Sequence, residues 1–142
     1  MNVHAPQSLS PGDCQALIRG GGIGRVGVSV DALPAILPVR FALLDDGIVF
    51  RTGSETLSVE AVTNAIVAFE TDSVDDLGDG WSVLVVGRAA AIEDAAALEA
   101  ARQLPLAPLS SSDGDHFICI PAERISGWAF TTSGSHAPAT RL

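Results

Sequence analysis

The chain has 142 residues, with 8 Lys+Arg against 17 Asp+Glu, so its formal net charge at pH 7 is −9. All eight basic residues are arginines, and they form no basic run that could neutralise a row of phosphates. This charge distribution is compatible with an enzyme or a small-molecule binder, but it argues against duplex DNA and anionic membranes as partners. The length fits one domain over residues 1–142, with an ordered core from about 9 to 130 and a flexible tail over 131–142.

Two features indicate a cytoplasmic protein. The N-terminal segment has neither a basic region nor a continuous apolar region of the kind found in secretory signals. No apolar stretch reaches the roughly 18 residues of a membrane span. Cys14 and Cys119 lie far apart and outside any CxxC motif, so we expect two reduced thiols packed as small apolar groups and no zinc site.

The first part of the chain predicts a helix followed by a strand. Ser10 is a suitable N-cap, Pro11 fits the first helical position, and Asp13 places a carboxylate at the positive end of the helix. Three glycines over 20–22 end this helix. From Gly24 to Val30 the apolar residues alternate, which is typical of a half-buried strand.

The next elements predict an antiparallel meander. After a turn over 31–34, a second strand runs over 35–44, where Pro38 favours a sheet edge or a bulge. Asp45, Asp46 and Gly47 form a strong hairpin signal, and a third strand follows over 48–51.

The second half predicts further strands and two short helices. We expect helices over 55–62 and 94–103, strands over 64–71, 81–92, 116–120 and 124–130, and loops over 72–80 and 104–114. The strand over 81–92 has a continuous apolar run and should be central, with both faces covered. The predicted fold is mainly β, a closed antiparallel barrel of six or seven strands with short helices at its ends.

The glycines over 22–27 match the pattern GxGxxG, which in dinucleotide-binding folds follows a strand and opens a helix. Here the predicted order is reversed, because a helix precedes the glycines and a strand follows them. We therefore interpret them as a helix terminator that runs into a glycine-rich strand.

A candidate anion site follows the third strand. Arg51 offers a two-pronged charged donor, Thr52, Ser54 and Thr56 offer hydroxyls, and the following helix start offers backbone N–H groups. An ordinary capping turn with a solvated arginine fits the same spacing.

Arg40 could contribute to the same site. It interrupts an apolar strand, so it must extend to solvent, pair with an acid or face a polar ligand. Arg40 and Arg51 lie on hairpin neighbours and could converge on one anion, but a one-residue shift in register would place them on opposite faces. Trp81 fits a core position or a wall against an aromatic ring, and His116 fits a surface histidine, a proton donor or an axial ligand.

Five short blocks occur in an order that resembles the pyridoxamine 5′-phosphate oxidase-like proteins of the FMN-binding split-barrel superfamily. They are Gly24-Arg25-Val26-Gly27-Val28-Ser29, Leu37-Pro38-Val39-Arg40-Phe41, Val49-Phe50-Arg51-Thr52-Gly53, Val67-Ala68-Phe69-Glu70-Thr71-Asp72, and the run from Gly80-Trp81-Ser82-Val83 to Ala89. The resemblance covers about residues 9 to 127 and is closest to a form common in actinobacteria.

The resemblance implies a six-stranded antiparallel split barrel, a homodimer and FMN held at the dimer interface. By position it implies that Pro38, Val39 and Arg40 lie along the flavin ring and ribityl chain. Arg51 and Thr52 would lie near the ring or the phosphate, and Ser54 and Thr56 at the phosphate. Trp81, Ser82 and Val83 would line the cleft. The implied activity is hydride or electron transfer between the flavin and a small-molecule substrate.

One departure concerns the phosphate. Family members commonly carry a lysine where this chain has Leu57, and Glu55 adds an acid nearby. Losing one charge-assisted hydrogen bond would weaken FMN binding roughly ten- to a hundredfold unless Arg40 compensates. The substrate-recognition pattern of true pyridoxamine phosphate oxidases is absent, so vitamin B6 oxidation is not expected. Two alternatives to an FMN oxidoreductase stay open: a deazaflavin-dependent reductase, and a cofactor-free or haem-binding split-barrel dimer without catalytic activity.

Overall fold

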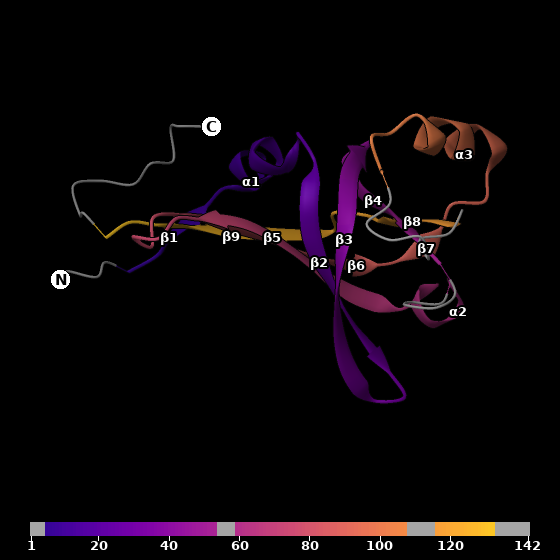
Figure 1. Ribbon diagram of the computed structural model, residues 1–142, viewed down its shortest axis with the longest axis horizontal. Coiled ribbons are helices and arrows are strands. Elements are labelled where there is room, and N and C mark those ends of the chain that lie inside the picture. Colours follow the sequence, from indigo (N-terminus) through magenta and orange to yellow (C-terminus); the bar gives the residue numbers. More distant parts are fainter. Residues whose placement is uncertain (1–4, 54–58, 108–115, 133–142) are drawn as a thin grey trace.

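The computed structural model describes residues 5–53, 59–107 and 116–132 (Figure 1). Within them the chain is mainly β. The strands are β1 (Gln7–Leu9), β2 (Gly22–Val30), β3 (Leu33–Leu44), β4 (Gly47–Thr52), β5 (Ile66–Val74), β6 (Gly80–Arg88), β7 (Ala90–Ala91), β8 (His116–Ile120) and β9 (Arg124–Phe130). The helices are α1 (Pro11–Ile18), α2 (Val59–Val62) and α3 (Ala95–Arg102).

The strands form one antiparallel sheet in the order β1-β9-β6-β5-β2-β3-β4-β8-β7. Only Ala89 separates β6 from β7, and β7 pairs with β8 at the other end of this order. The sheet therefore curls back to its own strand. Six strands make up the curl (β2, β3, β4, β5, β8 and the β6–β7 segment), while β9 and β1 extend from β6. The expected split-barrel architecture is confirmed.

Local sequence signals explain the first elements. Ser10 caps α1, because its side-chain oxygen accepts a hydrogen bond from the Asp13 backbone N–H at 3.1 Å. The hairpins β2–β3 and β3–β4 close through two-residue turns in which both residues have positive φ. They are Asp31 and Ala32, and Asp45 and Asp46. Such turns match the twist of paired strands. The meander of β2, β3 and β4 is therefore confirmed.

The inner face of the curled sheet carries the main core. Phe50 and Phe69 are fully buried there, and the rings of Phe41 and Phe69 meet edge to face at 4.7 Å between centroids. A second cluster lies on the outer face, where α3 packs Ala101 against Ala42, Val49 and Phe117. This helix covers part of the outer wall of the barrel.

Several element boundaries differ from the prediction. The strand expected over 81–92 is interrupted at Ala89, because β6 pairs with β5 and β9 whereas β7 pairs with β8. Its outer face is open, with Leu84 40% exposed, so the prediction that both faces are covered was wrong for the protomer. The loop expected from Asp72 starts later, because β5 continues to Val74 opposite Gly80. β1, which pairs with β9, was not predicted.

Pro38 is accommodated at a local edge. β3 lies between β2 and β4, but its pairing with β4 covers only Phe41–Leu44. At Pro38, β3 pairs with β2 alone, and Pro38 lies opposite Arg25. The edge expected from this proline is therefore present, although the strand as a whole is internal.

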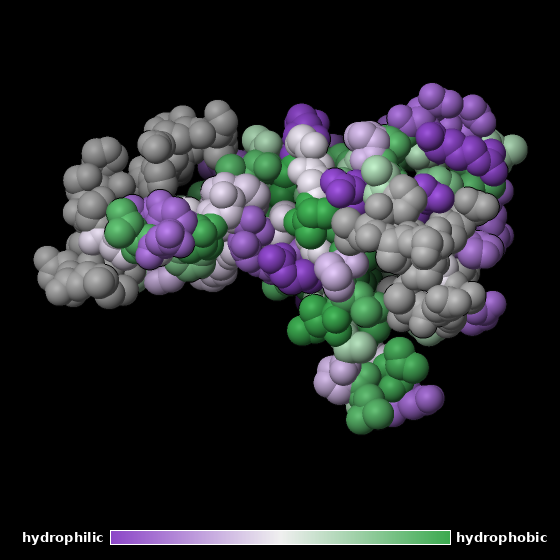
Figure 2. Space-filling model, viewed as in Figure 1, coloured by the Kyte–Doolittle hydropathy of each residue, from purple (hydrophilic) through white to green (hydrophobic). Residues whose placement is uncertain are grey.

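The β2–β3 hairpin projects from the rest of the molecule (Figure 1). Its end is apolar, with Leu33 71% and Ile36 72% exposed. Figure 2 shows this arm as a largely hydrophobic extension below the body of the molecule. Exposed apolar side chains gathered on one element form a patch of the kind that is found at interaction surfaces.

Candidate functional site

Arg40 and Arg51 lie on the same, outer face of the sheet. Phe41 pairs with Phe50 in the β3–β4 hairpin, and both rings are buried in the main core. Residues 40 and 51 are the next opposed positions of this register, and side chains alternate along a strand. Their side chains therefore leave the sheet on the side opposite the core, and the uncertainty about the register is resolved in favour of a shared face.

Both guanidinium groups are held by backbone carbonyls of the segment after α3. Arg40 donates from Nε to the carbonyl oxygen of Ala107 at 2.9 Å, and Arg51 donates from Nη1 to that of Leu106 at 3.4 Å. The Arg51 guanidinium carbon also lies 5.7 Å from the Phe117 ring centroid, within the range of a cation–π contact. The sequence did not indicate this segment, because any residue provides a carbonyl.

The other predicted residues on β3 and β4 divide between the two faces. Thr52 is 3% exposed, and its hydroxyl donates to the carbonyl oxygen of Gly53 at 3.4 Å. Val39 is buried in the main core, and Pro38 lies on the outer face opposite Arg25. Ser54 and Thr56, together with Glu55 and Leu57, lie outside the described residues.

The predicted residues on β6 are separated from the arginines within one chain. Val83 is fully buried and Trp81 packs against the main core, while Ser82 lies on the outer face opposite Asp72. β5 and β2 stand between β6 and β3 in the sheet. Three strand spacings of about 4.8 Å put Ser82 roughly 14 Å from Arg40. One protomer therefore does not bring the two groups of residues into contact.

A charged cluster that the sequence analysis did not single out occupies the middle of this face. Arg25 on β2 donates from Nη1 to Glu70 Oε1 on β5 at 2.9 Å, and Asp72 lies two residues further along β5. Burial raises the pKa of Glu70 to about 7; a hydrogen bond with Asp72 and its charge act in the same direction, and Arg25 opposes them. Glu70 therefore exchanges a proton near neutral pH.

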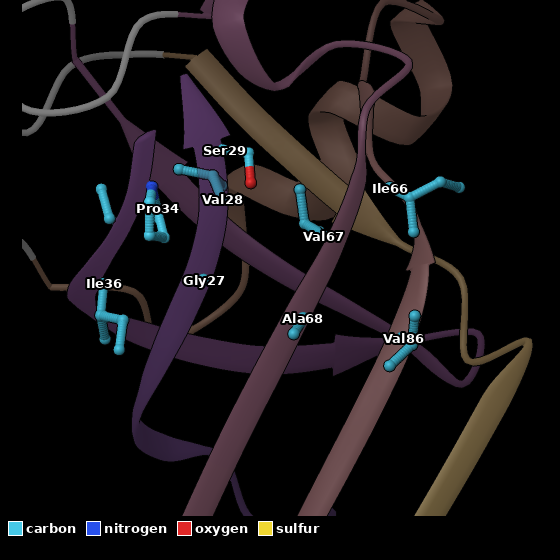
Figure 3. Close-up of a pocket in the computed structure, with 10 residues that line it drawn as sticks. Gly27, Val28, Ser29, Pro34, Ile36, Ile66, Val67, Ala68 and Val86 are labelled. Carbon is cyan, nitrogen blue, oxygen red and sulfur yellow. The ribbon is translucent and has the colours of Figure 1, made fainter. Parts of the chain in front are cut away.

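An open apolar hollow of about 280 Å³ lies next to this cluster. Figure 3 shows Gly27 and Ala68 in its middle, with Pro34 and Ile36 on one side and Ile66 and Val86 on the other. The hollow exists because the two central residues are the smallest ones and are cross-strand partners in the β2–β5 pair. Its lining carries no charged side chain.

His116 begins β8, where it is exposed and opposite Thr52. Among the described residues, no group of three or more His, Cys, Asp or Glu side chains could hold a metal ion. None of the described helices is long and apolar enough to cross a membrane. The GxGxxG pattern lies in β2 directly after α1, so the interpretation as a glycine-rich strand is confirmed.

Comparison with known proteins places this geometry in a family. The family model for pyridoxamine 5′-phosphate oxidase matches residues 10–129. Rv0080, an uncharacterised protein of Mycobacterium tuberculosis, is 32% identical over 110 residues, which cover 73% of this chain and 72% of that protein.

Two solved structures share the fold over most of the chain. The FAD-binding protein of Mycobacterium smegmatis has a TM-score of 0.74 at 31% identity and covers 89% of this chain and 98% of its own. A putative pyridoxamine 5′-phosphate oxidase of Corynebacterium glutamicum has a TM-score of 0.75 at 26% identity and covers 90% and 95%. With its curled six-stranded sheet and the family match over residues 10–129, the chain belongs to the pyridoxamine 5′-phosphate oxidase-like split-barrel family.

Proposed function

We propose that the protein is a homodimeric flavin-dependent oxidoreductase that binds FMN on the outer face of β3 and β4 and exchanges hydride or electrons with a small molecule. The observation that carries this proposal is the pair Arg40 and Arg51, which share one face and are held by two successive carbonyl oxygens. A phosphate monoester is a ligand whose charge and shape suit two planar guanidinium groups.

The donor set fits a phosphate group. The structure gives Arg40 a neutral carbonyl as its partner, and no ion pair of Arg40 appears within the described part of the chain. Its positive charge is therefore not neutralised by a carboxylate there, in a chain whose net charge is −9. The FAD-binding relative in M. smegmatis, at 31% identity, supports a flavin as the occupant.

In this proposal the flavin supplies the redox chemistry, and the chain binds and orients it. Arg40 and Arg51 hold the phosphate, and Pro38, which lies on the same outer face, lies along the ring and ribityl chain. The side chains of Val39 and Thr52 are buried and are not part of this surface. A second copy covers the ring with the outer face of β6, on which Ser82 lies, and excludes water. Apart from binding and orienting the flavin, the chain need not supply a catalytic acid or base.

Two observations support a dimer. Ser82 lies roughly 14 Å from Arg40 within one chain, as three strand spacings require, so a ligand that contacts both is best served by two copies. The projecting β2–β3 hairpin also exposes Leu33 and Ile36, which a second copy would cover.

The test is the visible spectrum of the purified protein, followed by titration with FMN. We expect a yellow protein that bleaches on chemical reduction. Arg40→Met should weaken FMN binding roughly ten- to a hundredfold. The matched control is Arg102→Met, because Arg102 is an exposed α3 residue that forms an ion pair with Glu99 at 3.8 Å. A colourless protein unaffected by FMN would overturn the proposal. Tighter binding of a deazaflavin would favour the reductase alternative, and a haem spectrum lost in His116→Ala would favour the haem-binding one.

A further inference from the structure

The segment that follows α3 forms a tight turn anchored on the outer face of the sheet. The Leu106 backbone N–H donates to the Leu104 carbonyl oxygen at 2.8 Å, which closes the chain around Pro105. The Leu106 side chain is 5% exposed and packs in the cluster that contains Val49 and Phe117. The turn over 105–107 is therefore fixed at both its backbone and its central side chain.

This turn directs its carbonyl oxygens at the two arginines. Leu106 and Ala107 accept hydrogen bonds from Arg51 and Arg40, respectively, so two residues from different strands are tied to one rigid piece of backbone. Phe117, which lies next to Arg51 in the cation–π contact, is also one of the side chains that anchor Leu106. The turn and the arginine pair are therefore packed as a single unit.

The contact made by Arg40 leaves the two-pronged end of its side chain for another ligand. A guanidinium group has five N–H donors, and in the described part of the chain the structure gives Arg40 one hydrogen bond, from Nε. Fixing Nε orients the plane of the group and hence both Nη atoms, which lie on the far side of the guanidinium carbon. A carbonyl acceptor achieves this without neutralising the charge.

We propose that the turn over 105–107 is a positioning element for an oxyanion site at Arg40, whose ligand class is a phosphate monoester or inorganic phosphate. The proposal rests on the proposed function only in naming the FMN phosphate as the natural ligand. It predicts the direction in which the anion affinity changes. Loosening the turn weakens anion binding, because the guanidinium is no longer held in place. If the carbonyl oxygens instead competed with the ligand, loosening the turn would strengthen binding.

The experiment measures the affinity for FMN and, separately, for inorganic phosphate in Leu106→Ala and Leu104→Ala. Both changes remove a leucine from the same apolar cluster, but of these two leucines only Leu106 has a carbonyl that accepts a hydrogen bond from an arginine among the described contacts. We expect about tenfold weaker binding of both ligands in L106A and less than a twofold change in L104A. Leu106→Met, which restores an apolar anchor, should recover affinity. The free energy of unfolding of each variant is measured as well. If L106A fails to fold, the comparison is repeated between L106M and Leu106→Val.

Arg40→Lys provides an independent test, since it keeps the charge but removes the Nε contact and the fork. We expect roughly ten- to a hundredfold weaker phosphate binding. Unchanged or tighter binding in L106A, or unchanged affinity in R40K, would overturn the proposal, as would a wild-type protein that binds no phosphate. Phosphate binding that follows this pattern without FMN binding would uphold the positioning role and reject the proposed function.

Discussion

Gly24 and Gly27 lie three residues apart on β2 but face opposite sides of the sheet, and a side chain would meet very different surroundings at the two positions. At Gly24 an added Cβ would overlap the ring of Phe69 and come within 2.9 Å of the Glu70 carbonyl oxygen. At Gly27 the nearest atoms, the Cβ and carbonyl oxygen of Ala68, would be 3.9 Å away, which is an ordinary contact. One glycine is required by packing against the core, and the other leaves room for the hollow.

Alanine substitutions at these two positions should therefore have opposite effects on the free energy of unfolding. Gly24→Ala forces the buried Phe69 ring to move and should lower the free energy of unfolding by about 1–3 kcal/mol. Gly27→Ala adds a methyl group to open space in a strand and should raise it by roughly 0.5–1 kcal/mol. Urea unfolding of the two variants and the wild type measures the difference. A G24A protein as stable as G27A would contradict the close packing of Phe69 against β2.

The Arg25–Glu70 pair should make stability depend on pH. The folded pKa of Glu70 is raised from 4.5 to about 7, chiefly by burial, so the folded chain holds a proton that the unfolded chain has already lost. The stabilisation of the folded state by protonated Glu70 is complete below about pH 4.5 and is lost as the pH rises to about 7. Because Glu70 is 35% exposed, solvent screening reduces the effect to about 1 kcal/mol.

Glu70→Gln tests this, because glutamine mimics the protonated acid at every pH. The stability of E70Q relative to the wild type should increase from pH 5 to pH 8. Thermal unfolding of both proteins across this range gives the difference, which cancels the contributions of groups that do not interact with Glu70. A difference that is flat with pH, or that falls, would show that Glu70 does not retain its proton near neutrality.

The two thiols should react slowly in the folded protein. Cys14 has no exposed surface and Cys119 is half-buried; burial raises the pKa of both thiols, and nearby Asp13 and Asp45 add to it, respectively. Only the thiolate attacks a disulfide reagent. We expect Cys119 to be modified before Cys14, and both to react fully once the protein is denatured. Rapid modification of Cys14 under native conditions would contradict its place in the core.

The strand pattern was predictable because it depends on local signals. Alternating valines identify β2, and the acidic pair followed by Gly47 identifies the β3–β4 hairpin. Where the structure differs, a partner far away in the sequence decides. β5 continues to Val74 because β6 pairs alongside it, and the chain breaks between β6 and β7 where β8 replaces β5 and β9 as the neighbour.

The candidate site was predictable only in part. Arg40 stood out as a charge within an apolar strand and Arg51 as a charge at the end of one, but their shared face depended on a register that the sequence left open. The carbonyl oxygens of Leu106 and Ala107 carry no side-chain signal at all. Glu70 and Arg25 alternate with apolar neighbours as any exposed charges do, and only the pairing of β2 with β5 brings them together.

The last prediction concerns the apolar arm. Leu33→Asp combined with Ile36→Asp should convert the proposed dimer into a monomer, because two charges would have to be buried at the interface. The control is Leu77→Asp, since Leu77 is 72% exposed, as Ile36 is, but lies in the turn between β5 and β6, away from this arm. Sedimentation of all three proteins at micromolar concentration measures the outcome. A monomeric wild type would reject the dimer, and a dimer that survives the double substitution would show that the arm lies outside the interface. If the double variant alone dissociates and also loses FMN binding, the site draws residues from both copies, as the proposed function expects.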